Sequence, residues 1–322
     1  MSDTRRPVTV PTAVYNRIVP EMHVPRIGLR RRLYSALVIA AMAAIIELVG
    51  SRLSGSLALL SDAGHVGTDA IAIGVSLWAL WISERPHTPR MSFGYHRIEV
   101  LSSLANALLL LGIAAFLGVQ AYNRALSPPP VTGSLMFLAG LAGLGANLLM
   151  LAILREPARQ NINVRSAFLH AYGDTLGSIG VVVGAVLITT TGVVLFDVLI
   201  AVSIILLILV SAVRLLLDVV RILLEASPAG IRPEDIAREI ESVEGVRGVH
   251  DLHVWTVTSG LYWLTGHIRV DGGTSVEDAG RIVERIQGRL KDRFGIAHAT
   301  LQVDSVHETL ITPSDIARGT GP

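Results

Sequence analysis

Six long apolar segments occupy the first two thirds of the chain and set its architecture. Each contains about 20 mostly apolar residues, which at a rise of 1.5 Å per residue is the length of a helix that crosses a bilayer. The pattern therefore predicts six transmembrane helices. The first 25 residues are polar and carry four prolines, so we expect no cleavable signal peptide. The predicted helices cover roughly residues 33–51, 57–82, 100–122, 134–154, 166–190 and 194–217.

Arginines cluster on one side of these segments. The loops on the other side carry only Arg52 and Arg124. Positive residues concentrate on the cytoplasmic side of membrane proteins, so we expect both chain termini in the cytoplasm. The arginines on the cytoplasmic side are Arg26, Arg30, Arg31, Arg32, Arg85, Arg90, Arg97, Arg155, Arg159, Arg165, Arg214 and Arg221.

After residue 227 the charged residues return and no segment is long enough to span a membrane. The hydrophobic periods predict the order α-β-β-α-β, with helices over 233–243 and 275–293 and strands over 246–257, 261–270 and 297–304. The expected organisation is a cytoplasmic tail over 1–29, a six-helix membrane domain over 30–227, a small cytoplasmic α/β domain over 228–306 and a loose tail over 307–322.

Composition supports this division and excludes several classes of protein. Hydrophobic residues make up 51% of the chain and charged residues 16%, whereas about 25% is usual for a soluble domain. A net charge of +1 argues against a nucleic-acid partner. The chain has no cysteine, so a metal ion would need ligands from His, Asp, Glu or backbone oxygen.

The ionisable residues inside the predicted membrane helices carry the chemistry. His65 and Asp69 are four residues apart on the second segment, and His170 and Asp174 repeat this spacing on the fifth. Residues with this spacing share one helix face. Two such helices facing each other would offer two imidazoles and two carboxylates, a ligand set that suits tetrahedral zinc. The alternative is a set of interhelical hydrogen bonds and salt bridges, although each buried Asp would cost about 2.5–3.5 kcal/mol.

Other polar residues in the membrane segments have weaker assignments. Asp62 lies three residues before His65, and we expect it to support the metal ligands or to line the ion path. Glu47 and Asp197 lie near predicted helix ends, so we expect them to be solvated or helix-terminal. Asn106 and Asn147 are expected to form interhelical hydrogen bonds.

Four segments of the chain resemble the cation diffusion facilitator family of metal transporters. They are SGSLALLSDAGHVGTDA at 54–70, SFGYHRIEVL at 92–101, NINVRSAFLHAYGDTLGS at 161–178 and GVHDLHVW at 248–255. The resemblance implies six membrane helices, a cytoplasmic metallochaperone-like domain and a homodimer that exports divalent cations in exchange for protons. It places the transport site at His65, Asp69, His170 and Asp174, and this two-His, two-Asp set is similar to that of the zinc-preferring branch.

The resemblance also implies sites outside the membrane helices. Family ligands in the cytoplasmic domain fall on His250, His267 and the end of the last strand, where Gln302 stands at a position that is commonly His. We therefore expect a reduced metal site of His250, His267 and Asp304, against the alternative that these are ordinary surface polar residues. Arg97 and Glu225 match family positions that form an ion pair between the two domains; simple solvent exposure is the alternative.

The expected activity is export of Zn²⁺ from the cytosol by proton antiport with alternating access, and not enzymatic catalysis. Metal ligands must lose their protons to bind, so metal entry would release protons. Zn²⁺ would be the cargo and a ligand of the cytoplasmic domain, and no organic cofactor is expected. The expected partners are the lipid bilayer and a second copy of the chain. A single lysine among 27 basic residues is typical of GC-rich bacteria, which suggests the inner membrane.

Other functions stay open at this point. The cargo could be Cd²⁺, Co²⁺, Fe²⁺ or Mn²⁺, because selectivity depends on geometry as well as on ligand type. A membrane metal sensor or scaffold without transport is a further alternative. An intramembrane metallohydrolase would need a general base such as the Glu of H-E-x-x-H, and Val66 and Ala171 follow the two histidines instead.

Overall fold

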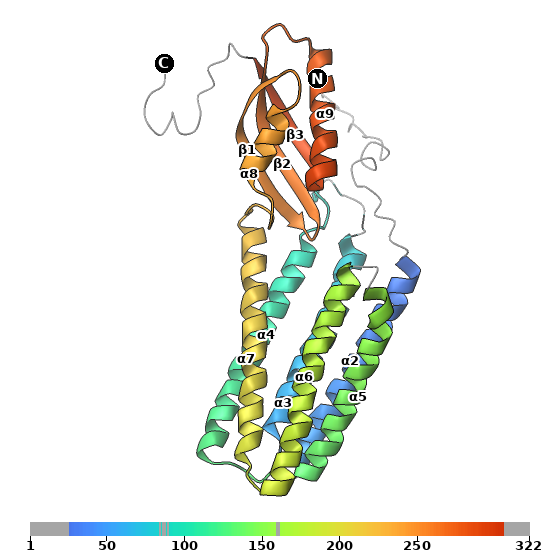
Figure 1. The fold of residues 1–322 in the computed structure, drawn as a ribbon, viewed down its shortest axis with the longest axis vertical. Helices are drawn as coiled ribbons and strands as arrows, with labels where there is room; N and C mark the ends of the chain where they lie inside the picture. The colour runs from blue at the N-terminus through green and yellow to red at the C-terminus, as the bar shows by residue number, and fades with distance from the viewer. Residues whose placement is uncertain (1–25, 84, 86–87, 89, 159–161, 306–322) are drawn as a thin grey trace, which may run out of the picture. The chain divides into compact units, whose positions relative to one another are not determined.

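The computed structural model describes residues 26–305 apart from 84, 86–87, 89 and 159–161. The described residues divide into two compact units, one that ends at Val220 and one that begins at Arg221. The tails expected at 1–29 and 307–322 fall almost entirely outside the described residues. Figure 1 labels the helices and strands of both units.

Among the described residues, six long helices make up nearly all of the first unit, and each corresponds to one predicted membrane segment. The prediction of six helices is therefore confirmed. The helices are α2 (Arg26–Ser54), α3 (Leu57–Ser83), α4 (Ile98–Leu126), α5 (Gly133–Ala158), α6 (Ile162–Thr191) and α7 (Leu195–Leu223).

The outward faces of these helices are apolar. Large side chains such as Phe116, Val183 and Leu206 are exposed, which would be costly in water and is favourable against lipid. Within the described residues, five helices are long and apolar enough to cross a membrane, and α3, which carries Asp62, His65 and Asp69, is the remaining long helix. The five spans are Leu37–Ser54, Ile98–Leu126, Gly133–Arg155, Ala171–Thr191 and Leu195–Leu223.

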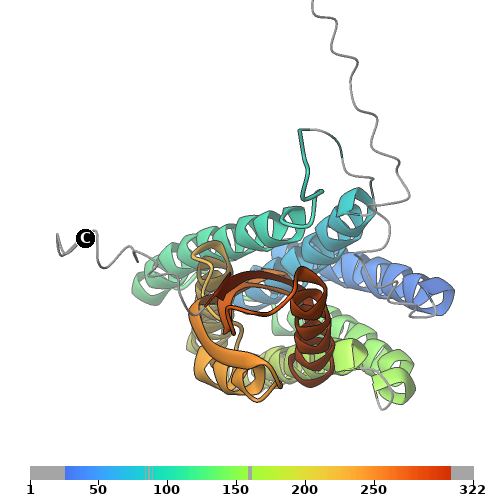
Figure 2. The ribbon, with the colours of Figure 1, turned by 90° about the horizontal axis from the view of Figure 1, so that it is seen from above.

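Helix α2 packs against α3 and α5, α5 packs against α6, and α3 packs against α4 (Figure 2). Glycines allow the closest approaches. A Cβ atom at Gly50 of α2 would overlap the side chain of Ala139 of α5, and one at Gly143 of α5 would overlap the carboxylate of Glu47. Because apolar surface gains little by leaving lipid, such close contacts are a main source of stability between membrane helices.

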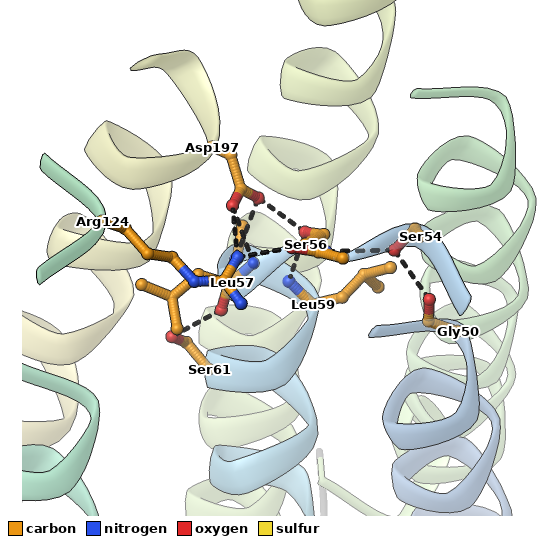
Figure 3. A network of polar contacts seen from close by, with 10 residues as sticks. Gly50, Ser54, Ser56, Leu57, Leu59, Ser61, Arg124 and Asp197 are labelled. Carbon is orange, nitrogen blue, oxygen red and sulfur yellow. Dashed lines mark hydrogen bonds and ion pairs between the residues drawn. The ribbon is translucent and has the colours of Figure 1, made fainter. Parts of the chain in front are cut away.

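The start of α3 is held by a residue from α7 (Figure 3). Both carboxylate oxygens of Asp197 accept hydrogen bonds, from the Ser56 hydroxyl at 2.6 Å and from the backbone N–H groups of Leu57 and Ala58 at 2.7 and 3.1 Å. The Arg124 guanidinium of α4 lies 3.7 Å from the same carboxylate and donates to the Gly55 carbonyl. The sequence predicts that Asp197 is solvated or helix-terminal. It is helix-terminal, in the first turn of α7, but it is not solvated, because it is 1% exposed and caps another helix.

The second unit contains a three-stranded sheet and two helices, and the predicted order α-β-β-α-β is confirmed. The strands lie in the order β1-β2-β3, with β1 antiparallel and β3 parallel to the central β2. Both helices contact the sheet and each other, so they cover the same face. The elements are α8 (Pro233–Glu241), β1 (Val246–Thr258), β2 (Leu261–Val270), α9 (Val276–Phe294) and β3 (Ile296–Ser305).

Apolar residues on α8, α9 and the covered sheet face form the core of this unit. Its fully buried members include Ile236, Leu264, Ile268, Ile286 and Leu290. The Ser275 hydroxyl caps the start of α9 by accepting from the Asp278 N–H, and Gly295 ends the helix at φ 67°. Since the helices bury one face of the sheet, polar side chains of β2 and β3 collect on the other face.

Candidate functional site

Three of the four ligands predicted in the membrane helices come together. The His65 Nε2 lies 3.1 Å from the Asp174 Oδ1, and its Nδ1 lies 3.8 Å from the Asp69 Oδ2. One ligand atom from each residue can be chosen so that all three lie within 4.8 Å of one another. The site therefore joins α3 to α6 by one imidazole and two carboxylates.

The fourth predicted ligand, His170, lies on α6 one turn before Asp174. Its side chain falls outside the described residues, so its membership of the site stays a prediction.

The three described ligands are close enough together to hold a small divalent cation. Tetrahedral zinc with bonds of about 2.0–2.1 Å holds its ligand atoms about 3.3 Å apart. One atom from each of the three residues can be chosen within 4.8 Å of the others, so modest side-chain rotation would bring them to that spacing. The 3.1 and 3.8 Å distances involve the two different nitrogens of the His65 ring, of which one would bind the ion. The Asp174 side chain is 7% exposed and that of His65 16%, which means that neighbouring parts of the protein cover most of both side chains.

A second polar group lies beside this site. Asp62 is fully buried and accepts a 3.0 Å hydrogen bond from the Ser178 hydroxyl, which in turn accepts from the Asn147 Nδ2 at 3.0 Å. The expectation that Asn147 bridges helices is confirmed, because Ser178 belongs to α6. The role expected for Asp62, in support of the metal ligands or in the ion path, stays a prediction.

Glu47 also belongs to the helix interior. It is fully buried, and its carboxylate packs on Gly143 of α5. The expectation that Glu47 is solvated or helix-terminal is therefore wrong. The position of Glu47 near the predicted helix end does not indicate that α5 packs over its side chain.

The second unit brings His250, His267 and Asp304 together. The His250 Nε2 and the His267 Nδ1 lie 3.3 and 3.2 Å from the same Asp304 oxygen, Oδ2. The two histidines are opposite each other in the β1–β2 pairing, and their ring centroids are 5.1 Å apart. Asp304 is 3% exposed, whereas the histidines are partly exposed, so the cluster opens to one side.

Two further residues adjoin this cluster, and sequence alternation missed one of them. Alternation along β1 predicts that Asp251 points away from His250. The register shifts between His250 and His253, Asp251 has φ 50°, and its carboxylate lies 3.8 Å from the His267 Nε2. The predicted direction is wrong because this bulge re-aims the side chain. Gln302, which is opposite His267 on β3, donates to the Asp304 Oδ1 at 2.9 Å.

Arg97 and Glu225 belong to different units. Arg97 precedes α4, and Glu225 follows α7 with φ 57°. Each unit is described by itself, so the ion pair between Arg97 and Glu225 stays a prediction.

Known protein families match both the membrane part and the cytoplasmic part of the chain. Residues 33–224 match the family model described as the cation efflux transmembrane domain, and residues 228–306 match the cation efflux protein cytoplasmic domain. The metal cation efflux system protein CzcD of Cupriavidus metallidurans is 37% identical over 86% of this chain and 87% of its own length. The zinc transporter ZitB of Escherichia coli is 38% identical over 88% and 90%.

Two other comparisons extend the range of named metals and include a solved structure. The cadmium, cobalt and zinc/H(+)-K(+) antiporter of Bacillus subtilis is 36% identical over 81% of this chain and 84% of its own length. The metal-bound C-terminal domain of the CzcD transporter is 31% identical, covers 23% of this chain and 99% of that one, and superposes with a TM-score of 0.21. With its membrane-spanning helices and its match over both domains, the chain belongs to the cation efflux family of metal transporters and is a multi-pass protein of the bacterial inner membrane.

Proposed function

We propose that the protein exports Zn²⁺ from the cytosol in exchange for protons, with the ion held by His65, Asp69, His170 and Asp174. One observation carries this proposal. The imidazole of His65 and the carboxylates of Asp69 and Asp174 converge from two helices, with one possible ligand atom from each within 4.8 Å of the others, inside a membrane-spanning group of helices. Cd²⁺ and Co²⁺ are the alternative cargoes, because the named relatives include transporters of these metals.

The ligand chemistry supports coupling to protons. Imidazole titrates near pH 6.5, and each ligand must be unprotonated to bind the metal. Metal entering from the cytoplasm therefore releases protons, and protons on the other side compete for the same atoms and displace the ion. Rocking of the helices around the site would expose it to each side in turn.

A flux assay tests the proposed exchange. In proteoliposomes with an acidic lumen, we expect external Zn²⁺ to enter and the luminal pH to rise in parallel, because each ion exchanges for protons. Zinc uptake is followed with an enclosed zinc-sensitive dye, and luminal pH with a second dye. A protonophore should remove the driving force and most of the uptake. Zinc binding to the purified protein without any uptake would instead identify a sensor or scaffold.

We propose that His250, His267 and Asp304 form a second zinc site, in a cytoplasmic domain that pairs two chains of a homodimer. Two imidazole nitrogens within 3.3 Å of one buried carboxylate oxygen support the site. Asp251 offers a further oxygen near His267, and Gln302 holds the Asp304 carboxylate in place.

Calorimetric titration of the full chain can isolate this cytoplasmic site. In an Asp69→Asn, Asp174→Asn background, zinc should still bind, and His250→Ala should weaken that binding at least about 10-fold, because it removes one of two nitrogen ligands. His298→Ala is the matched control, since His298 lies on the same sheet but contacts Trp263. Equal titration curves for His250→Ala and the control would contradict the site.

A further inference from the structure

Several buried oxygen atoms around Glu47 can accept hydrogen bonds but have no hydrogen-bond donor among the described residues. Among the described residues, no hydrogen-bond donor reaches either carboxylate oxygen of Glu47, the Asp62 Oδ1 or the Asn147 Oδ1. Glu47 and Asp62 are fully buried, and Asn147 is 1% exposed. Buried polar atoms nearly always have a hydrogen-bond partner. These oxygen atoms therefore require either a bound cation or a proton on one of the carboxylates.

Glu47 adjoins a hydrogen-bonded chain of polar side chains. Glu47 rests on Gly143 of α5, and Asn147 lies one helical turn further along the same face. Asn147 donates to Ser178, and Ser178 donates to Asp62. Helices α5, α6 and α3 therefore each contribute one member of this chain, and Glu47 of α2 lies beside its α5 end.

The charges around Glu47 are negative on the sides that face the transport site. Helix α3, which packs against α2, brings the buried Asp62, and helix α6, which packs against α5, brings the buried Asp174. His65 and Asp69 follow on the inner face of α3. On α5, the described side chain that is formally charged is Arg155, three turns beyond Gly143, and on α2 the nearest one is the exposed Arg52. No described cation pairs with Glu47, so an ionised Glu47 would lie unpaired beside other acids, which a bilayer interior disfavours strongly.

We propose that Glu47 is a proton-binding site separate from the metal ligands, and that metal entry at the transport site expels its proton. This proposal rests on the proposed function, because it assigns one of the protons exchanged for zinc. In the metal-free protein Glu47 is a neutral carboxylic acid. A divalent ion bound by His65, Asp69 and Asp174 offsets the negative field at Glu47, so the O–H bond breaks, the carboxylate keeps the electron pair and H⁺ leaves to the aqueous phase.

Proton counting during zinc binding tests this assignment. Titration calorimetry in buffers of different ionisation enthalpy gives the number of protons released per zinc ion. We expect Glu47→Gln to release about one proton fewer than the wild type while still binding zinc, because the amide cannot ionise. Glu47→Asp, which keeps a carboxyl group, should retain the release. Glu234→Gln, an exposed Glu on α8, is the matched control and should behave as the wild type.

The possible outcomes separate the two proposals. If the wild type binds zinc but shows no proton-coupled flux, the proposed function fails. If flux is intact and Glu47→Gln releases as many protons as the wild type, the Glu47 assignment fails. A dependence of zinc binding on Na⁺, K⁺ or Mg²⁺ that Glu47→Gln removes would overturn it in favour of a cation site.

A spectroscopic measurement on the wild type keeps the assignment testable if Glu47→Gln does not fold. Zinc addition should remove one infrared band of a protonated carboxyl group and add a carboxylate band. The Glu47→Asp variant should shift the lost band. A difference spectrum without any lost carboxylic-acid band would overturn the proposal.

Discussion

Asp174→Asn is expected to lower zinc flux by more than about 100-fold, since losing even an outer partner of a metal ligand costs 10–100-fold in affinity or activity. The substitution keeps the size of the side chain but removes a negative charge from a site of one imidazole and two described carboxylates. It also replaces the oxygen that lies 3.1 Å from the His65 Nε2. The initial rate of zinc uptake into proteoliposomes measures the effect.

Asp218→Asn provides the matched control for this substitution. Asp218 lies near the end of α7 and is exposed, so the same chemical change there should leave the uptake rate unchanged. Thermal unfolding in detergent should show that both variants remain folded. Uptake at the wild-type rate in the Asp174→Asn protein would exclude the transport site proposed on α3 and α6.

Asp197→Ala is expected to destabilise the membrane unit by about 3 kcal/mol. The substitution leaves the Ser56 hydroxyl and the Leu57 and Ala58 N–H groups without their acceptor, and it removes the carboxylate beside Arg124. Arg124 is 22% exposed, so water can partly replace its lost partner. The measurement is the unfolding midpoint in mild detergent.

Graded substitutions distinguish the cap from the charge of Asp197. Asp197→Asn keeps one acceptor oxygen and should lose roughly half as much stability as Asp197→Ala. Removing Arg124 together with the carboxylate, in Asp197→Ala with Arg124→Leu, should cost less than the sum of the single changes, because no unpaired cation is left. If Asp197→Ala has the same unfolding midpoint as the wild type, the cap contributes no stability.

The membrane helices and the centre of the transport site could be predicted because lipid imposes a simple rule on sequence. Segments of about 20 apolar residues predict spans, and within them a charge is rare enough to be informative. The spacing of His65 and Asp69 on one helix face predicts that they act together. Their meeting with Asp174 needed one further assumption, that α3 and α6 are neighbours.

The burial of Glu47 and Asp197 could not be predicted in the same way. Both lie near predicted helix ends, and their environment depends on which other helix covers them. Asp197 contacts residues 139 to 141 positions earlier in the chain. No local pattern carries that information, because hydrophobic periodicity describes one helix at a time.

The cytoplasmic domain shows a different limit. Its element order followed from alternation and helical spacing, but alternation assumes a regular strand. The positive φ of Asp251 breaks the two-residue period within β1 and turns its carboxylate toward His267. Asp tolerates a positive φ better than most residues do. The presence of Asp at position 251 is therefore the one feature of the sequence that is compatible with a bulge there.

The cap on α3 also has a consequence for the biosynthesis of the protein. A ribosome makes the chain from its N-terminus, so α3 leaves the ribosome long before α7, whose Asp197 lies 140 residues beyond Leu57. Until α7 inserts, the first N–H groups of α3 lack this acceptor, and the last helical hairpin therefore completes a helix made much earlier. Nascent chains that end before Asp197 should therefore be cleaved by protease near Gly55, whereas the complete chain should be protected there.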